Sequence, residues 1–230
     1  MPTLYVAGVS ISSNPKDISP VTLKKIKNAD VIIGEERKIA LRLLNVAEKS
    51  ADCLYLLNEH SKDTDRQEIL DVLLKSNTAV LFSDSGTPCI SDPDFTFIDM
   101  CRKKGITIKS LAGASSITAA ISVSGLDAKR FFFAGFPPKD KKERQIFFKE
   151  IFSYPYMAIF MERPYTLETT LRELLVFKRK IFLSINLGSD EEMNLFDFPE
   201  KLIEETKAIK APFIVIIPKN KNNKKIIIKK

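Results

Sequence analysis

The sequence has little of the chemistry on which metal-dependent and thiol-dependent enzymes rely. Its 230 residues include one histidine, three cysteines and no tryptophan. The cysteines, Cys53, Cys89 and Cys101, are odd in number and lack C-x-x-C spacing, so the pattern indicates neither a disulfide framework nor a thiolate zinc site. A single histidine also argues against a histidine-based metal site. We therefore predict no metal, and we interpret Cys89 as a packing residue because no histidine is near it in the sequence.

Long apolar runs are also missing. No stretch of about 18 consecutive apolar residues occurs, which argues against a membrane span. The N-terminus enters a strand-like segment without a basic leader, so we expect a cytoplasmic protein. With 44% hydrophobic and 28% charged residues, the chain can bury a sizeable core, in one large domain or two small ones.

Positive charge is concentrated at one end of the chain. The net charge is +7, but residues 219–230 contain six lysines and no acid, so the rest of the chain is nearly neutral. Such a basic tail can hold a nucleic-acid backbone without reading its sequence, or it can simply keep the protein soluble. A second basic cluster is internal and is a somewhat better contact candidate; it consists of Lys139, Lys141, Lys142 and Arg144.

Strand and helix signals alternate along almost the whole chain. Short apolar runs predict strands at residues 3–9, 31–33, 53–57, 79–82, 106–110, 130–134, 156–160, 180–185 and 212–217. Amphipathic spacing and end signals predict helices at residues 19–28, 35–48, 93–104, 140–152, 166–175 and 199–207. Another helix is expected from the capping-box form of Thr64-x-x-Gln67, and Gly105 is expected to end a helix. In the first half, five strands separated by helices predict an α/β fold with a mostly parallel sheet covered on both faces.

Two turns in this pattern suit a ligand. Residues 83–93 follow a buried strand and lead to a helix start, with Asp92 as N-cap and Pro93 in the first turn. They contain a glycine, a proline and small polar side chains, so backbone can approach a ligand beyond the carboxyl end of a strand, where ligands bind in open α/β sheets. Residues 111–120 form a second such turn with a helix start, where Ser115 and Ser116 can cap the helix or bond a ligand.

The second of these turns also suggests a division of the chain. We predict an N-terminal domain of residues 1–112, a C-terminal domain of residues 113–218 and the basic tail of residues 219–230. A ligand cleft is expected between the two domains.

Four segments, in matching order over most of the chain, carry a resemblance to a known family. They are S-D-S-G-T-P-C-I-S-D-P at 83–93, L-A-G-A-S-S-I-T-A-A at 111–120, S-G-L at 124–126 and F-F-F-A-G-F-P at 131–137. Together they resemble the ribosomal RNA small subunit methyltransferase I family of the tetrapyrrole methylase superfamily. That family transfers a methyl group from S-adenosylmethionine to a cytidine ribose 2′-hydroxyl in 16S RNA. The resemblance implies a two-domain class III methyltransferase, each domain a sheet flanked by helices, that acts as a homodimer on ribosomal RNA of the small ribosomal subunit.

The resemblance also implies which residues bind S-adenosylmethionine. They are Asp84, Ser85, Gly86, Thr87, Ile90, Ser115, Ser116, Gly135, Phe136, Asn186 and Leu187. Purely structural roles stay open for some of them, because Asp84 could cap its own turn and Gly86 could only supply a positive φ angle. Helix capping likewise accounts for the two serines.

Looser matches point to the methyl acceptor. The family motifs E-D-T-R, H-D-H-N and F-Y-E-S have partial counterparts at residues 35–38, 58–61 and 160–163. These counterparts keep Glu35, His60 and Glu162, which we predict as catalytic residues. The alternatives are solvated charges for the two glutamates, and for His60 a surface position or an RNA phosphate contact.

Two segments depart from the family pattern. Residues 9–14 replace a T-P-I-G-N-L loop, and residues 185–190 replace an R-E-L-T-K run. Both are expected to shape the substrate side, so the resemblance supports the cofactor more firmly than the RNA target. Two alternatives therefore stay open: a methyltransferase for a small tetrapyrrole-like molecule or other metabolite, and a non-catalytic RNA-binding or ribosome-assembly protein with a relict cofactor cleft.

Overall fold

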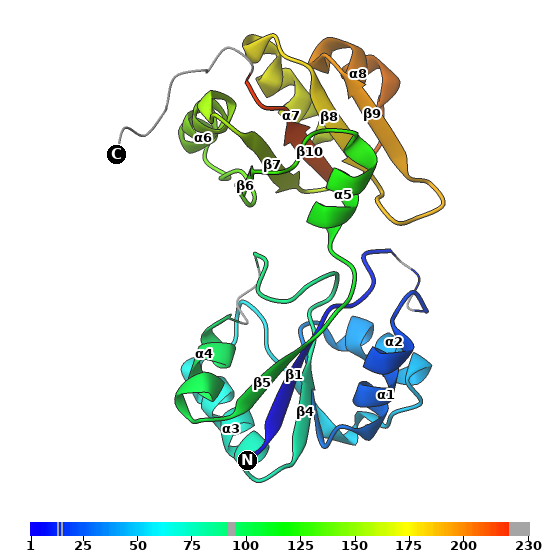
Figure 1. The fold of residues 1–230 in the computed structure, drawn as a ribbon, viewed down its shortest axis with the longest axis vertical. Helices are drawn as coiled ribbons and strands as arrows, with labels where there is room; N and C mark the ends of the chain where they lie inside the picture. The colour runs from blue at the N-terminus through cyan, green and yellow to red at the C-terminus, as the bar shows by residue number, and fades with distance from the viewer. Residues whose placement is uncertain (13, 15, 92–94, 221–230) are drawn as a thin grey trace. The chain divides into compact units, whose positions relative to one another are not determined.

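The chain forms two compact units, each built on one five-stranded sheet (Figure 1). The structure is a computed structural model, which describes residues 1–12, 14, 16–91 and 95–220. The units are Met1–Ser115 and Ser116–Lys230, whereas we predicted domains of residues 1–112 and 113–218. The predicted fold class, α/β with a helix-flanked sheet in each half, is confirmed. Most of the predicted basic tail, residues 221–230, lies outside the described residues.

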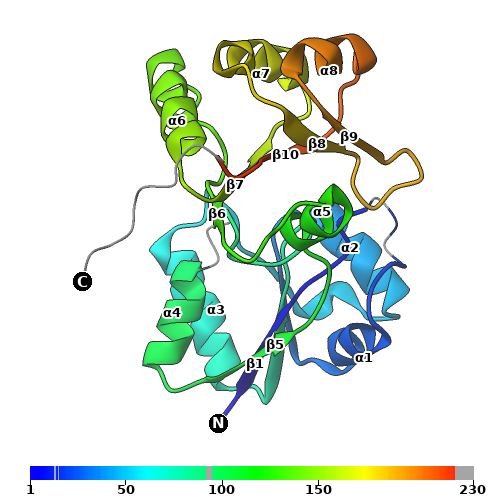
Figure 2. The same cartoon turned by 45° about the horizontal axis from the view of Figure 1, so that its top comes forward.

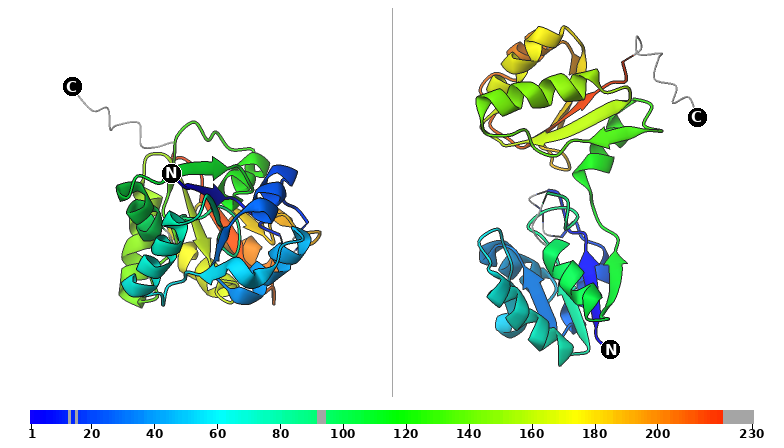
Figure 3. Two further views of the ribbon diagram at one scale, coloured as in Figure 1. Left: turned by 90° about the horizontal axis from the view of Figure 1, so that it is seen from below. Right: turned by 90° about the vertical axis from the view of Figure 1, so that its left-hand side faces the viewer.

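The first unit holds a fully parallel sheet of order β3-β2-β4-β1-β5. Its strands are β1 (Thr3–Ala7), β2 (Val31–Gly34), β3 (Leu54–Leu56), β4 (Thr78–Leu81) and β5 (Thr107–Leu111). In register, β1 places Thr3 beside Thr78 of β4 and beside Thr107 of β5, and Figure 3 shows β1 in dark blue. The central strands are apolar because both faces of the sheet are covered.

Two pairs of helices cover the faces of this sheet (Figure 2). They are α1 (Pro20–Asn28), α2 (Arg37–Val46), α3 (Asp63–Leu74) and α4 (Phe95–Lys103), with a short 3₁₀ helix at Ala51–Cys53. Side chains of α1 and α2, such as Ile26 and Leu44, belong to one apolar cluster. Side chains of α3 and α4, such as Leu73 and Phe97, belong to a second. The sheet therefore separates two apolar cores within the first unit.

The ends of these helices follow local chemistry, with one correction. Ser19 caps α1 as predicted, since its hydroxyl accepts from the Val21 N–H at 3.2 Å. The capping box predicted at Thr64-x-x-Gln67 is wrong, because α3 begins earlier and the Asp65 carboxylate accepts from the Lys62 N–H at 2.8 Å. Gly105 follows α4 with φ +76°, as a helix stop requires. The predicted start of this helix at Asp92 and Pro93 lies outside the described residues.

The second unit holds a mixed sheet of order β6-β7-β10-β8-β9. Its strands are β6 (Phe131–Phe133), β7 (Met157–Glu162), β8 (Ile181–Ile185), β9 (Met193–Asp197) and β10 (Phe213–Ile217). Strand β9 was not predicted. Both β7 and β8 pair antiparallel with β10, so they run in the same direction and end at the same edge of the sheet. Strand β6 pairs parallel with β7 and ends at that edge too.

Helices cover both faces of the second sheet. They are α5 (Ser116–Ser124), α6 (Lys141–Ser153), α7 (Leu167–Leu174) and α8 (Pro199–Glu205), with a 3₁₀ helix at Leu175–Phe177. Phe148 of α6, Leu171 of α7 and Leu202 of α8 share one apolar cluster with Phe160 of β7. Helix α5 contacts β10 and β9, and Figure 2 shows it on the other side of the sheet from α6, α7 and α8. Within the described ranges, no helix is long and apolar enough to cross a membrane.

Candidate active site

Three loops meet at the carboxyl end of the parallel sheet in the first unit. They follow β1, β4 and β5. The Val9 N–H donates to the Gly86 carbonyl at 2.8 Å, and the Gly86 N–H donates to the Ser10 carbonyl at 3.2 Å. The Gly8 N–H donates to the Leu111 carbonyl at 3.0 Å. These bonds fix the predicted cofactor loop, residues 83–91 of the described chain, against the loop after β1, which is in turn bonded to the end of β5.

The loops after β1 and β5 touch through two glycines. A Cβ at Gly113 would lie 2.1 Å from the Gly8 carbonyl oxygen, and a Cβ at Gly8 would lie 2.8 Å from the Gly113 Cα. No real side chain fits at such separations, so only glycine allows the two backbones to approach this closely.

Some side chains of the loop after β4 make hydrogen bonds that hold the loop in its conformation. Gly86 has φ +74°, which favours glycine. The Thr87 hydroxyl donates to the Ala114 carbonyl at 3.1 Å, and the Ser85 hydroxyl donates to the Ser10 carbonyl at 3.4 Å. Cys89 also has a positive φ, of 68°, which is strained for a residue with a Cβ. Ile90 lies in the same loop and is half-buried.

Asp84 links this loop to the loop after β2. Its Oδ1 accepts from the Glu36 N–H at 2.9 Å, while the Asp84 N–H donates to the Glu35 carboxylate at 3.3 Å. Burial raises the pKa of the Asp84 carboxyl; the hydrogen bond from Glu36 opposes this rise, and the Glu36 charge adds to it. The structure therefore brings together Glu35, which we predicted as catalytic, and Asp84, which we predicted to bind the cofactor.

His60 is placed differently. It lies in the loop after the edge strand β3, its side chain is 86% exposed, and its Nε2 is 3.7 Å from the Glu59 carboxylate. Its backbone N–H donates to the Asn58 side chain at 3.0 Å. The histidine thus stands at the carboxyl end of the sheet with an imidazole open to solvent.

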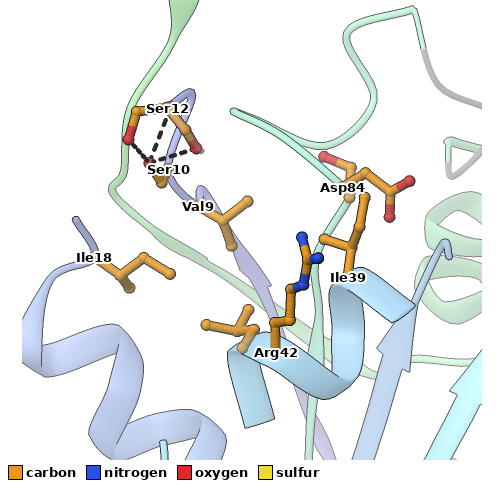
Figure 4. Close-up of a pocket in the computed structure, with 9 residues that line it drawn as sticks. Val9, Ser10, Ser12, Ile18, Ile39, Arg42 and Asp84 are labelled. Atoms are coloured by element: carbon orange, nitrogen blue, oxygen red, sulfur yellow. Dashed lines mark hydrogen bonds between the residues drawn. The ribbon is translucent and has the colours of Figure 1, made fainter. Parts of the chain in front are cut away.

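A cavity of about 150 Å³ opens beside Asp84 (Figure 4). It is lined by Val9, Ser10, Ser12, Ile18, Ile39, Arg42, Leu43, Ser83 and Asp84. Of these residues, sequence reasoning identified only Asp84 as a site residue. Ser83 begins the 83–93 turn that carries the family motif, although it was not predicted as a site residue. The other lining residues come from α2 and from the loop between β1 and α1, and their only sequence signal was that the β1 loop departs from the family pattern.

Five of the remaining predicted cofactor residues lie in the second unit, near one edge of its sheet. Gly135 follows β6 and accepts from the Met161 N–H at 3.0 Å, and the Ser116 hydroxyl lies 3.5 Å from the Met161 sulfur. Asn186 follows β8 with φ +52°, and its N–H donates to the Pro212 carbonyl at 3.1 Å. Two more predicted residues adjoin these positions, Phe136 and Leu187. Ser115 is the last residue of the first unit.

This edge leaves room for a ligand at Gly135. The residue has φ +77°, and a Cβ there would meet no described atom within 4 Å. The Arg163 guanidinium stands 5.8 Å from the centre of the Phe136 ring, so a cation and an aromatic face lie next to this opening. The backbone at this point is open to close approach, which suits a bound cofactor.

Glu162, the third predicted catalytic residue, lies in a buried ion-pair network. It is 2% exposed, and its Oε2 accepts from Arg144 Nη1 at 2.7 Å while its Oε1 accepts from the Arg163 N–H at 3.0 Å. Arg144 also donates to Glu173 at 2.7 Å. The suggestion that Arg144 is a contact residue of an exposed basic cluster is therefore wrong, because the side chain points into the unit and is paired there.

No group of three or more potential metal ligands occurs in residues 1–12, 14, 16–91 and 95–220.

Comparison with known proteins agrees with this geometry. The family model of tetrapyrrole (corrin/porphyrin) methylases matches residues 3–195. The chain is 31% identical over 222 residues to a ribosomal RNA small subunit methyltransferase I from Halalkalibacterium halodurans, covering 95% of this chain and 76% of that protein. The resemblance stated from the sequence motifs is thereby confirmed.

Solved structures share the fold at lower identity. A diphthine synthase superposes with a TM-score of 0.75 at 17% identity, covering 95% of this chain and 90% of its own. A uroporphyrin-III C-methyltransferase from Thermus thermophilus, complexed with S-adenyl homocysteine, gives a TM-score of 0.63 at 13% identity, covering 94% and 97%. At these identities, the structural similarity shows only that the fold is shared.

Proposed function

Because this chain belongs to the tetrapyrrole methylase family, and within it to the ribosomal RNA small subunit methyltransferase I proteins, we propose that it transfers a methyl group from S-adenosylmethionine to a ribose 2′-hydroxyl of 16S ribosomal RNA. The observation that carries this proposal is the 31% identity to a protein of that name across 95% of the chain. The interlocked loops after β1, β4 and β5 add a rigid ligand site where such a fold needs one.

The predicted cofactor residues of each unit remain the candidates for binding S-adenosylmethionine. In the first unit these belong to the loop after β4, from Asp84 to Ile90, and in the second to the edge that includes Gly135 and Asn186. S-adenosylmethionine supplies a methyl group on a sulfonium sulfur. The chain's own contribution is to hold the acceptor in line with that methyl group and to exclude water, which does not require a metal or a covalent protein intermediate.

A ribose hydroxyl is a poor nucleophile at neutral pH, so a group that takes its proton would help. We propose Glu35 or His60 for this role, because both lie at the carboxyl end of the first sheet. Glu162 is not carried into the proposal as a base, because both of its carboxylate oxygens already accept hydrogen bonds in the buried network. We assign it to positioning the end of β7 instead.

Binding of S-adenosylmethionine tests the first part of the proposal. Isothermal titration calorimetry should show binding to the wild type, and Asp84→Arg should abolish it because a bulky cation replaces a half-buried carboxylate. The control is Asp71→Arg, which makes the same change at an exposed position of α3 and should bind normally. A wild type that does not bind would end the proposal.

Methyl transfer tests the second part. Labelled S-adenosylmethionine should modify RNA in isolated 30S subunits. Label on a small porphyrinoid but not on RNA would favour the metabolite enzyme instead. RNA affinity without any transfer, in the presence of S-adenosylmethionine, would favour a non-catalytic RNA-binding protein.

We also propose that the protein acts in the cytoplasm as a homodimer. Light scattering coupled to size-exclusion chromatography should give a mass twice that of one chain. A single-chain mass at micromolar concentration would contradict the dimer without affecting the proposed chemistry.

A further inference from the structure

One end of the second sheet carries a row of aromatic side chains at its surface. Phe132 lies on the edge strand β6 and is 40% exposed, and its ring centre is 4.9 Å from that of Tyr154. The ring centre of Tyr154 is 5.9 Å from that of Tyr156. Both tyrosines are half-buried and lie between α6 and β7. We call Phe132, Tyr154 and Tyr156 the aromatic row; aromatic side chains that cluster at a surface mark an interaction site.

A cation lies at one end of the aromatic row. Arg130 Nη1 donates to the Tyr156 hydroxyl at 3.0 Å, and the guanidinium carbon is 5.5 Å from the centre of that ring. Arg130 is exposed and forms no ion pair with a carboxylate of residues 1–12, 14, 16–91 and 95–220. A guanidinium has five N–H donors, so most of them stay available for an anionic ligand.

The basic tail begins near the aromatic row. Strand β10 pairs antiparallel with β7, so its last residue, Ile217, lies beside the start of β7, the strand that follows Tyr156 (Figure 2). Arg179 donates both to a carbonyl in the last turn of α6 and to the Pro218 carbonyl, which ties the start of the tail to the helix that leads to the tyrosines. Residues 219–230 contain six lysines and no acid, so nearly all of the net positive charge follows this point of the chain.

Aromatic rings beside available cations suit single-stranded RNA. Unpaired bases stack on aromatic side chains whatever their sequence, while arginines and lysines bind the phosphate backbone. A second copy of the chain fits less well. A two-fold contact through the aromatic row would turn the positive charge around it toward its own copy, and like charges repel.

We propose that the aromatic row is a separate RNA contact, on which bases of a single-stranded segment stack while Arg130 binds a phosphate group. Arg130 and the tyrosines precede β6 and β7, whereas Gly135 and Asn186, at the predicted cofactor edge, follow β6 and β8. The six residues of β7 separate the two ends of the sheet by about 20 Å. The proposal rests on the proposed function, because the ribosomal RNA of that function supplies the single strand.

Fluorescence anisotropy with a labelled RNA decamer of adenosine and uridine tests the proposal. The decamer contains no cytidine, the acceptor nucleoside that the family resemblance implies, so the acceptor position does not account for its binding. The full chain should bind the decamer, and should bind the same decamer paired with its complement at least about tenfold more weakly, because paired bases are already stacked. No binding of the decamer, or equal affinity for the single-stranded and paired forms, would overturn the proposal.

Substitutions in the aromatic row separate the effect of an aromatic face from that of apolar bulk. Phe132→Leu and Tyr154→Leu keep an apolar side chain, and each should weaken binding of the decamer about tenfold. Tyr154→Phe keeps the ring and should bind as the wild type does.

A matched control lies on β9, the other edge strand of the same sheet. Phe196 is 47% exposed there, and Lys180 Nζ is 6.0 Å from its ring centre, so it too is an exposed ring beside a cation. Phe196→Leu should leave the affinity for the decamer unchanged. Equal effects of Phe132→Leu and Phe196→Leu would contradict the assignment, as would normal binding by both leucine variants of the aromatic row.

The salt dependence of binding tests the phosphate contact. Arg130→Gln should reduce the slope of log affinity against log salt concentration by about 0.7, the value for one phosphate contact on a single strand. Arg172→Gln changes the net charge equally at an exposed position of α7 and should leave the slope unchanged. An unchanged slope in Arg130→Gln would contradict the phosphate contact.

The outcome is separable from that of the proposed function. In Tyr154→Leu, calorimetry with S-adenosylmethionine should be unchanged while the KM for 30S subunits rises. Binding of the decamer to the aromatic row without any methylation of 30S subunits would leave this surface standing and remove the proposed function. Methylation of 30S subunits by a protein whose aromatic-row variants bind RNA normally would do the reverse.

A contact between two copies of the chain gives a different result. In that case Tyr154→Leu would halve the mass found by light scattering and leave the affinity for the decamer unchanged, and the RNA contact would be overturned. The proposal predicts the opposite pair of results, an unchanged mass and a weaker affinity.

Discussion

The backbone N–H of Glu36 donates to the carboxylate of Asp84 across 2.9 Å, and this bond joins the loop after β2 to the loop after β4. The Asp84 N–H returns a bond to the Glu35 carboxylate at 3.3 Å. Two residues that sequence reasoning assigned to different tasks, Glu35 to catalysis and Asp84 to the cofactor, are thus held in one local structure. A substitution at either residue is therefore expected to alter the position of the other.

Asp84 should make stability depend on pH. Burial raises its pKa above the ordinary value of 3.8, so the folded protein holds the proton more tightly than the unfolded chain does. Its contribution to stability is fully present below the ordinary pKa and is lost as pH rises through the higher folded value. In urea titrations across this range, Asp84→Asn should lose less stability with rising pH than the wild type, because the amide does not ionise. Identical pH profiles for the two proteins would contradict this assignment.

The Arg144 network should stabilise the second unit. Arg144→Ala leaves the Glu162 carboxylate buried without its partner, and breaking such a buried pair costs about 3–5 kcal/mol of unfolding free energy. Arg172 pairs with Glu168 on the exposed face of α7, and Arg172→Ala should cost less than about 1 kcal/mol. Denaturant unfolding measures both. Equal losses of unfolding free energy in the two variants would contradict a larger stabilising contribution from the buried network.

Gly113→Ala should disturb the junction of the loops after β1 and β5, because the new Cβ would lie 2.1 Å from the Gly8 oxygen. Overpacking of this kind costs about 1–3 kcal/mol or more. At Gly125 a Cβ would meet no described atom within 4 Å, so Gly125→Ala carries only the strain of its positive φ of 66° and should cost less. Thermal unfolding of the two variants compares steric overlap with backbone strain. A milder effect at Gly113 would contradict the close approach.

The three cysteines should react at different rates with a thiol reagent. Burial raises the pKa of the Cys101 thiol to about 12, so it should stay unmodified at pH ~8 until the protein unfolds. Cys53 and Cys89 are half-buried and should react. Since Cys89 lies in the proposed cofactor loop, S-adenosylmethionine should slow its labelling but not that of Cys53. Peptide mass spectrometry resolves the sites, and equal protection of both would place the cofactor elsewhere.

The sequence predicted the elements whose signals are local. Buried apolar runs such as Val31–Gly34 and end signals such as Ser19 and Gly105 required no knowledge of distant partners. Strand β9 was missed because Met193–Asp197 alternates half-buried and exposed residues with none buried, which leaves a weak apolar signal. The start of α3 was misplaced because Asp65, rather than the expected pair, provides its capping carboxylate.

Of the residues that line the cavity, sequence reasoning singled out Asp84 because its loop carries its own motif, whereas residues that only the fold brings together were not recognised. Asp84 and Gly86 stand in a recognisable turn. Arg42, by contrast, looks like an ordinary helix charge until the fold brings the β1 loop next to α2. The direction of a side chain was equally hidden, since the basic run that contains Arg144 does not reveal that this residue turns inward to Glu162. Both features depend on contacts between distant segments, which the residue types alone do not reveal.

The chemistry of the methylated nucleoside tests the central claim most directly. Purified protein is incubated with methyl-labelled S-adenosylmethionine and 30S subunits whose 16S RNA lacks the modification, and the RNA is digested to nucleosides for mass spectrometry. We predict label on the ribose of a 2′-O-methylated nucleoside, with no label when Asp84→Arg replaces the wild type. Label on a base, or unlabelled RNA from a protein that binds S-adenosylmethionine, would contradict the assignment of this chain as a ribose methyltransferase of 16S ribosomal RNA.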